Sequence, residues 1–278
     1  MNRDDKKKKS PVEIVIMIFL IIMSIVSLVP FWLMFSMSTY LSEKIFLGNP
    51  MIPSDYLMEN LKTIFASNFV QSYGNSLLIS IVSMIVSVTL CSMVGYGMNV
   101  YNFKAKKALY IFIMMTMMVP SQLGIIGYMI EMRVVGLNNT LWPMMFVWFA
   151  NGFGAYWMIS FISGALPLEL VESARIDGAN EITIFSKIVI PCIRPGILTL
   201  CLLIFLWSWN NYMIPLVFTN KQENYTIPIF VKSLASAYRT DYGAQLAGLF
   251  LSTIPMLILF VIGSKNLIKG LTAGAVKG

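Results

Sequence analysis

Residues 6–37 read KKKKSPVEIVIMIFLIIMSIVSLVPFWLMFSM, four lysines followed after a short gap by an uninterrupted apolar run, Ile14–Met37. The run exceeds the ~20 apolar residues that a helix needs to cross a bilayer, and it contains no Asp, Glu, Lys or Arg. Lysines before an apolar run also begin a secretory signal, but the apolar part of a signal has only about 7–15 residues and is followed by a small-residue cleavage site. The sequence therefore predicts a retained first membrane span.

The composition of the whole chain extends this interpretation. Of its 278 residues, 57% are hydrophobic and 12% are charged, about half the ~25% charged fraction of an ordinary soluble domain. Further apolar runs without charged residues have the length of a span, so we predict an all-α polytopic membrane protein with six transmembrane helices. The predicted spans are Ile14–Met37, Tyr73–Tyr101, Ala108–Ile130, Leu141–Gly164, Gly196–Phe218 and Ala244–Ser264.

The positive charges orient these spans. Fourteen of the 20 Lys and Arg residues lie in the N-terminus, in the loops after the second and fourth spans, and in the C-terminus. Because cytoplasmic loops are enriched in Lys and Arg, both termini are predicted to be cytoplasmic, in a multi-pass protein of a bacterial cytoplasmic membrane. The topology accounts for the net charge of +7, so the expected surroundings are a lipid bilayer and not nucleic acid. The predicted segments are a basic N-terminus 1–13, a transmembrane domain 14–264 with a cytoplasmic loop 165–195 and external loops 38–72 and 219–242, and a cytoplasmic tail 265–278.

The residue types exclude several kinds of chemistry. The chain has no His, and its three Cys are scattered without CxxC spacing, so we expect no catalytic residue and no metal site. An ion-coupled secondary carrier needs an acid or base within its spans, and an intramembrane enzyme needs an Asp pair, a Ser–His system or an HExxH motif. The predicted spans offer neither, so the protein is predicted not to be an enzyme.

The predicted spans contain glycines and prolines that are expected to affect helix packing and helix continuity. Two glycine pairs, Gly95 with Gly97 and Gly152 with Gly154, are interpreted as points of close helix packing. Prolines within the spans are expected to kink or open the helices, which lines a path in some transporters but is also common in membrane helices generally. These prolines are Pro30, Pro120, Pro143, Pro215 and Pro255.

The cytoplasmic loop between the fourth and fifth spans is typical of a helix, a tight glycine turn and a second helix. Glu169 favours the first turn of one helix, Gly178 is placed to end it, and Asn180 can cap the next. Pro191 is predicted to stop the second helix, because the residue before proline avoids the helical region. Helices this short need a protein surface to pack against; the alternative is that their apolar stripe rests on lipid headgroups. The stripe of the second helix comprises Ile182, Phe185, Ile188 and Val189.

The residues of this loop resemble the EAA loop of ABC-importer permeases, written EAAxxDGA with a downstream Phe and Pro. The sequence ESARIDGA at 172–179 departs from it only at Ser173, a small residue. The resemblance implies that the loop couples the permease to a separate ATPase. The residues to which it assigns this role are Glu172, Ser173, Ala174, Asp177, Gly178, Ala179, Phe185 and Pro191.

The resemblance extends over nearly the whole chain and is closest to MalG-type permease subunits of carbohydrate uptake. Its most specific part is the C-terminal sequence GLTAGAVKG at 270–278. It implies the type I ABC-importer permease fold and the import of a sugar or oligosaccharide. A non-sugar solute such as a polyamine or phosphonate is the alternative within the same class, and an ion-coupled carrier is the alternative outside it.

The same resemblance implies partners. An ATPase dimer would hold the helices of loop 165–195 and bind ATP and Mg; this chain has no GxxxxGK[ST] sequence, so no cofactor is expected on it. A second homologous permease subunit would complete the translocation path, and an external solute-binding protein would meet loop 219–242. The tail is implied to reach the ATPase through Thr272, Lys277 and Gly278.

Polar and aromatic residues within the predicted spans are candidates for the translocation path, because sugars bind amides and aromatic faces. Intramembrane polar residues are functional candidates by default, although Asn and Gln also join helices by hydrogen bonds and Trp anchors membrane interfaces. The candidates are Gln122, Asn151, Tyr156, Trp209, Asn210 and Asn211.

Overall fold

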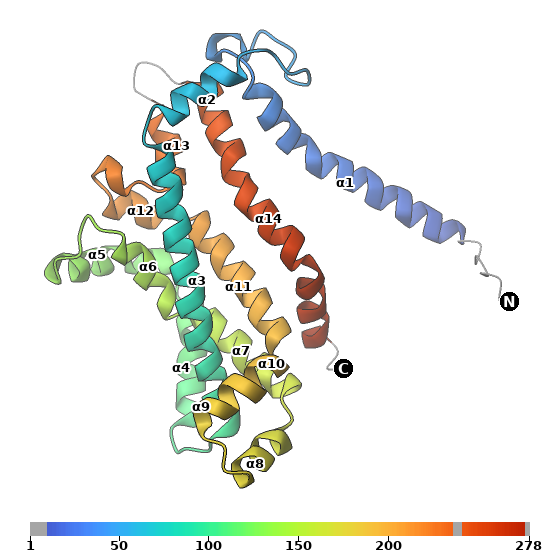
Figure 1. Ribbon diagram of the computed structural model, residues 1–278, viewed down its shortest axis with the longest axis vertical. Helices are drawn as coiled ribbons and strands as arrows, with labels where there is room; N and C mark the ends of the chain where they lie inside the picture. The colour runs from blue at the N-terminus through green and yellow to red at the C-terminus, as the bar shows by residue number, and fades with distance from the viewer. Residues whose placement is uncertain (1–9, 236–240, 276–278) are drawn as a thin grey trace. The chain divides into compact units, whose positions relative to one another are not determined.

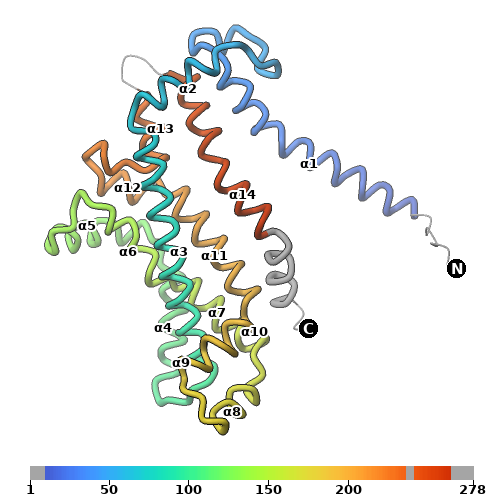
Figure 2. Tube along the Cα trace, viewed as in Figure 1, coloured from blue at the N-terminus to red at the C-terminus, as the bar shows by residue number. Residues whose placement is uncertain are grey.

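The computed structural model describes the backbone of residues 10–235 and 241–275, and the side chains of these ranges as far as residue 263. The chain is built from helices joined by turns and loops (Figures 1 and 2). A π-helical turn, Phe185–Val189, joins two of them. The α-helices are α1 (Pro11–Met37), α2 (Leu57–Phe65), α3 (Phe69–Val100), α4 (Lys106–Met118), α5 (Ile125–Val134), α6 (Trp142–Phe149), α7 (Gly152–Ala165), α8 (Leu168–Ile176), α9 (Glu181–Ile184), α10 (Ile190–Cys192), α11 (Arg194–Trp209), α12 (Met213–Phe218), α13 (Ile227–Ser233) and α14 (Tyr242–Ala275).

The chain forms two compact units. The first comprises the residues up to Ser67 together with Val231–Leu251, and the second comprises Asn68–Phe230 together with the residues from Ser252 on. Each unit is described by itself below. The loop that resembles the EAA loop lies in the second unit.

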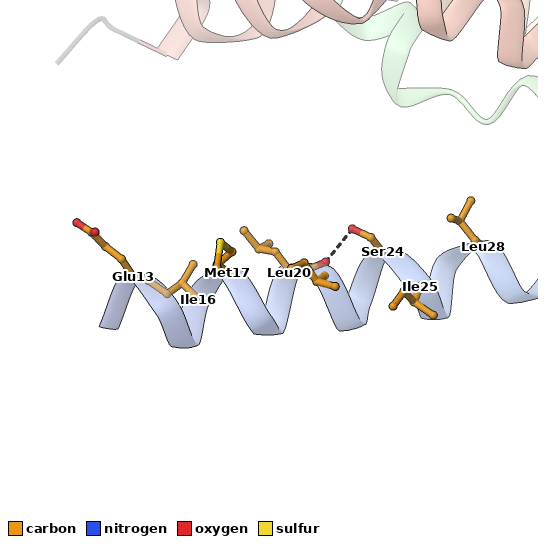
Figure 3. A pocket seen from close by; sticks show the side chains of 8 residues that line it. Glu13, Ile16, Met17, Leu20, Ser24, Ile25 and Leu28 are labelled. Atoms are coloured by element: carbon orange, nitrogen blue, oxygen red, sulfur yellow. Dashed lines mark hydrogen bonds between the residues drawn. The ribbon is translucent and has the colours of Figure 1, made fainter. Parts of the chain in front are cut away.

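Helix α1 of the first unit presents apolar side chains on all its faces. Ser10 and Glu13 form a capping box at its start, which satisfies two backbone N–H groups there. Residues 13–28 are exposed. Figure 3 shows side chains of this stretch from Glu13 to Leu28, with the Ser24 hydroxyl turned back to donate to the carbonyl of Leu20 at 2.7 Å. A helix with its hydroxyls satisfied internally and apolar groups outside is suited to contact with hydrocarbon.

The rest of the first unit folds around Asn60 of α2. The side-chain amide of Asn60, 2% exposed, donates to the carbonyls of Ser38 and Tyr40 at 2.8 and 2.9 Å. A buried asparagine therefore ties α2 to the chain that leaves α1.

Helix α3 organises the second unit. It packs along α7 and α11 and also contacts α6, while α4 packs on α7 (Figure 1). The buried face of α3 consists largely of small residues, which let neighbouring helices approach closely. They are Ser72, Ser76, Ser80, Ser83, Ser87, Cys91, Ser92 and Gly95.

The glycine predictions hold at three positions and fail at one. A Cβ on Gly95 would lie 2.8 Å from the backbone of Met158, and a Cβ on Gly154 would lie 2.7 Å from the Cys91 sulfur. Gly152 is similarly close to Thr116. Gly97 is different, because a Cβ there would meet nothing within 4 Å in this chain.

By length and composition, four stretches of the described residues could cross a membrane: α1, α3, the stretch from α6 through α7, and Tyr242–Gly263 of α14. The number rises to six if each of two bent helix pairs is counted as one span. The first pair is α4 and Ser121–Val134, and the second is Glu181–Cys192 and α11. The structure thus supports an all-helical chain with four to six apolar helices.

The predicted span 108–130 is not one continuous helix. Helix α4 ends at Met118, and the chain bends by 91° before Ser121–Val134. Val119 takes an extended conformation, with φ −82° and ψ 120°, because the helical region is disfavoured for the residue before a proline, here Pro120.

Two further predicted spans are interrupted at asparagines. The span 141–164 breaks at Ala150, and Asn151 then caps α7 by accepting from the Gly154 N–H at 2.6 Å. The span 196–218 breaks between α11 and α12, where Asn211 accepts from the Ile214 N–H at 3.0 Å. An asparagine oxygen replaces part of the helical hydrogen bonding that each break gives up. Trp142–Ala165 still has the length and composition of one span, whereas the predicted span 196–218 is divided between α11 and α12.

Candidate functional site

Loop 165–195 forms the predicted helix, glycine turn and helix at one end of the second unit (Figure 1). Helix α8 ends in a Schellman motif: the Gly178 N–H donates to the carbonyl of Arg175 at 3.0 Å, and the Ala179 N–H donates to that of Ala174 at 2.9 Å. Gly178 has φ +79°, in the left-handed region that favours glycine. The turn that sets the two helices at an angle therefore depends on this residue.

The second helix begins as predicted and ends later than predicted. Asn180 caps α9 by accepting from the Thr183 N–H at 2.8 Å. Pro191 does not stop the helix, which continues through α10 to Cys192 before the 82° bend into α11. Its ring lies in the first turn of α10, directly after the π-helical turn, where the hydrogen-bonding pattern already changes and the missing N–H costs little.

The helix pair buries one apolar face and exposes another. Val171, Ala174, Ile184 and Val189 are buried in the main core of the second unit, at 8% exposure or less. The predicted single stripe is therefore divided, since Val189 points into the core while Ile182 is exposed. The exposed apolar side chains, which we call the outer apolar face, are Leu168 at 46%, Leu170 at 46%, Ile176 at 87% and Ile182 at 80%.

The residues that match the EAA pattern fall on both sides of the helix pair. Glu172, Ser173 and Asp177 are exposed, and the side chains of Glu172 and Asp177 form no hydrogen bond or ion pair with a described residue. Ala174 is buried at 8% exposure, and Phe185 is half-buried against Tyr96 with ring centroids 5.6 Å apart. The motif thus combines residues that fix the loop to the helices with residues that face outward.

A cluster that sequence reasoning missed joins this loop to the end of α3. Tyr96, 6% exposed, donates its hydroxyl to Oε2 of Glu181 at 2.6 Å, and Arg175 donates Nε to Oε1 of the same carboxylate at 2.8 Å. The Arg175 guanidinium lies over the Tyr101 ring, 5.3 Å from its centroid. We call Tyr96, Tyr101, Arg175 and Glu181 the Glu181 clamp. Its hydrogen bonds, first that from Arg175, lower the pKa of Glu181 to about 2, so the carboxylate is charged at neutral pH.

Polar contacts also hold the other end of α3. The Asn75 amide donates to the carbonyls of Glu223 and Tyr225 at 2.8 and 3.0 Å, and the Ser76 hydroxyl accepts from the Ile227 N–H at 2.8 Å. Asn139, with φ 60°, bonds the same segment by accepting from the Asn220 N–H and from the Asn224 amide. Segment 219–226 is therefore fixed to two parts of the second unit. With 32 residues and a rise of 1.5 Å per residue, α3 separates the two ends by about 48 Å.

The path candidates lie mainly at the breaks in the predicted spans. Gln122 is exposed in the 3-10 turn after Pro120, and Asn151 and Asn211 accept backbone N–H groups as described above. Asn210 is exposed and donates to the carbonyl of Leu206 at 2.9 Å. The amides of Asn151, Asn210 and Asn211 thus bond backbone groups at or next to the breaks, and the role of all four residues in a path stays a prediction.

The two aromatic path candidates lie in the interior of the second unit. Trp209 is 2% exposed, stacks on Phe205 with centroids 5.7 Å apart, and donates its indole N–H to the carbonyl of Ser252 at 3.1 Å. Tyr156 is half-buried against the core. Of the tail candidates, Thr272 lies in α14 without a described side chain, and Lys277 and Gly278 lie outside the described residues.

Long apolar helices, spans broken at polar residues and a structured loop with an outer apolar face together define a subunit of a membrane transport system. Similarity to known proteins shows to which family within this class the chain belongs. The sequence profile of the family described as "binding-protein-dependent transport system inner membrane component" matches residues 87–271. The chain belongs to this family.

Curated relatives are similar over most of their length. The arabinooligosaccharide transport permease of Halalkalibacterium halodurans is 33% identical, covering 81% of each chain, and the lactose transport permease of Rhizobium radiobacter is 32% identical, covering 80% of this chain and 81% of its own. The trehalose/maltose permease of Thermococcus litoralis is 28% identical over 96% of this chain. A bacterial ABC transporter that imports the acidic polysaccharide alginate has the same fold, with a TM-score of 0.81 at 21% identity over 94% of this chain and 99% of its own.

Proposed function

We propose that this chain is a permease subunit of an ABC importer for a sugar or oligosaccharide. The relatives named above carry arabinooligosaccharides, lactose, and trehalose or maltose, and these names support a carbohydrate as the solute. Helix breaks at amide side chains suit a polar solute, because broken helices in transporters supply free backbone groups and side-chain amides to a path.

Loop 165–195 docks on a separate ATPase subunit, which binds ATP and Mg. The observation that carries this proposal is the outer apolar face: Ile176 and Ile182 are 87% and 80% exposed on either side of the Gly178 turn. Isoleucines exposed to this degree on a turn with a fixed conformation suit a cleft in a partner protein. The carboxylates of Glu172 and Asp177 on the same loop, which have no partner among the described residues, offer polar contacts to that cleft.

The chain crosses the inner membrane six times with both termini in the cytoplasm, and a second homologous permease completes the path. The turn 101–107, which holds Lys104, Lys106 and Lys107, lies at the same end of the second unit as loop 165–195, because Arg175 stacks on Tyr101. This common location supports a cytoplasmic loop by the positive-inside rule. Segment 219–226 at the opposite end of α3 then faces outward, where it meets an external solute-binding protein.

Purification of the chain from its native membrane in mild detergent, with identification of the proteins that accompany it, tests this proposal. We expect a homologous permease and two copies of an ATPase that carries a phosphate-binding loop. Ile176→Asp should remove the ATPase from the purified complex, whereas Ile52→Asp, a matched change at an exposed residue in the first unit, should not. Recovery of the chain alone, under conditions that preserve a known ABC complex, would contradict the proposal. Uptake of labelled arabinooligosaccharide, lactose and trehalose, with a polyamine for comparison, tests the class of solute.

A further inference from the structure

From the geometry of the Glu181 clamp, we infer that Glu181 is a positioning residue that makes α3 and the coupling helices α8 and α9 move as one body. The inference rests on the proposed docking of loop 165–195 on an ATPase. It adds a specific route, through α3, by which movement of the loop reaches the opposite end of the second unit.

One carboxylate joins three elements. Glu181 is the first residue of α9; its Oε2 accepts from Tyr96 of α3 at 2.6 Å, and its Oε1 accepts from Arg175 of α8 at 2.8 Å. The Arg175 Nη2 also lies 2.8 Å from Oε1, so the guanidinium and carboxylate form an ion pair as well as a hydrogen bond. These contacts add directional hydrogen bonds to the apolar packing of α8 and α9 and to the contact of Arg175 with Tyr101, and directional bonds resist sliding more than apolar packing does.

The Tyr96 side of the clamp is well placed to transmit force. Its ring is 6% exposed and packs against Phe185 of the π-helical turn and against Tyr101, with centroids 5.6 and 6.0 Å apart. A buried ring cannot follow the loop by changing rotamer without opening the core, so a displacement of Glu181 displaces the end of α3. The Glu181 clamp therefore fixes loop 165–195 to α3.

The far end of α3 has comparable attachments. Asn75 and Ser76 hold segment 219–226 and the start of α13 through three hydrogen bonds of 2.8–3.0 Å. Helix α3 is thus tied by polar contacts at Tyr96 to the ATPase-docking loop and, about 30 Å away along the helix at Asn75 and Ser76, to the segment proposed to meet the binding protein. Between these contacts α3 packs closely along α7 and α11, and the Asn99 amide donates to the carbonyl of Ile159 at 3.0 Å, so α7 belongs to the same body.

The test compares Tyr96→Phe, Glu181→Gln and their combination in the complete importer reconstituted in liposomes with its ATPase, second permease and binding protein. The readouts are the amount of assembled complex, ATP hydrolysis with and without the loaded binding protein, and solute molecules moved per ATP. The matched control is Glu59→Gln, which breaks an exposed 4.0 Å ion pair with Lys62 in the first unit.

We expect both single variants to assemble and to hydrolyse ATP, while stimulation by the binding protein and solute moved per ATP fall about three- to tenfold, the scale of losing one partly exposed charge-assisted hydrogen bond. The combined variant should lose less than the sum of the two single variants, because both changes weaken the same Tyr96–Glu181 contact. Wild-type solute transport per ATP in both single variants would overturn the inference.

A charge exchange keeps the test decisive if single variants do not assemble. Arg175→Glu combined with Glu181→Arg restores the ion pair with reversed polarity. Recovery of both assembly and transport per ATP supports the clamp, and recovery of neither overturns it. If the wild-type chain itself does not bind an ATPase, the proposed docking fails first, and that failure is visible before any variant is compared.

Discussion

Replacement of Gly178 tests the backbone geometry of the turn without the complication of crowding. Its φ is +79°, and a Cβ built there would meet nothing within 4 Å. In this chain Gly178→Ala therefore introduces backbone strain and no clash. An L-residue in the left-handed region costs about 1–2 kcal/mol, whereas asparagine adopts this region several-fold more often than other residues.

These energies predict a graded series. A cost of about 1–2 kcal/mol corresponds to a factor of about 5–30 in the population of the docking-competent turn. We expect Gly178→Val to be the most damaging change, because branched residues fit a positive φ worst, followed by Gly178→Ala and then Gly178→Asn. The helices α8 and α9 should still form, since their capping contacts are retained.

The assay is the amount of ATPase that copurifies with each variant, measured against the amount of inserted permease, together with ATP hydrolysed per solute moved. Gly97→Ala is the control, because a Cβ at Gly97 also meets nothing within 4 Å and its φ lies outside the positive range. A larger loss for Asn than for Ala would show that side-chain size at the ATPase surface, and not φ, sets the effect. Wild-type assembly in all three variants would refute the reasoning.

Three further predictions concern stability. The difference in Tm between the wild type and Glu181→Gln should stay constant from pH 8 to pH 5 and shrink as the pH falls toward 2. A carboxyl group whose pKa is lowered by folding stabilises the protein fully above its unfolded pKa of about 4.3 and loses this contribution as the pH approaches its folded pKa of about 2. Shrinkage of the difference between pH 7 and pH 5 would contradict this. Gly95→Ala should destabilise the detergent-purified chain by about 1–3 kcal/mol, since its Cβ would lie 2.8 Å from the backbone of Met158; Gly97→Ala is its control, and equal Tm values would disprove the packing argument. Asn60→Ala should cost about 1–3 kcal/mol by leaving two buried carbonyls without their donor, and an unchanged Tm would argue against this role of the amide.

The local chemistry of loop 165–195 could be predicted from sequence. Gly178 and Asn180 act within four residues of their own positions, through a positive φ and a side-chain cap. Effects that act over so few residues depend on the local sequence alone, so they can be predicted without knowing the rest of the fold. The same holds for the capping box of Ser10 and Glu13.

The break at Pro120 was expected from the proline, whereas the breaks at Asn151 and Asn211 were hidden by the apolar runs around them. A window of ~20 residues averages hydropathy, and one uncharged amide such as Asn151 or Asn211 changes that average little. The sequence signal for each of these two breaks was an asparagine inside an apolar run, because its side chain can accept a hydrogen bond from the backbone N–H three residues later and so start a new helix. Pro191 was predicted to end a helix that in fact continues, because the π-helical turn before it accommodates the proline.

The Glu181 clamp could not be predicted, because its partners are brought together only by the packing of α3 against the rest of the second unit. Tyr96 and Glu181 are 85 residues apart in sequence. Neither residue matches the EAA pattern, so the resemblance gave no reason to single them out. A carboxylate directly after an N-cap asparagine is fully explained by the helix dipole, which conceals its second role.

Polar contacts along α3 argue that it moves together with α7 and loop 165–195. Asn75 and Ser76 bond segment 219–227 near one end, and Tyr96 bonds Glu181 near the other. The Asn99 amide also donates to the carbonyl of Ile159 of α7 at 3.0 Å, and the close approach of Gly95 to Met158 fixes the register of α3 against α7. Because α7 leads into α8 through two residues, a displacement of the loop is carried by this group of helices together and not by α3 sliding past α7.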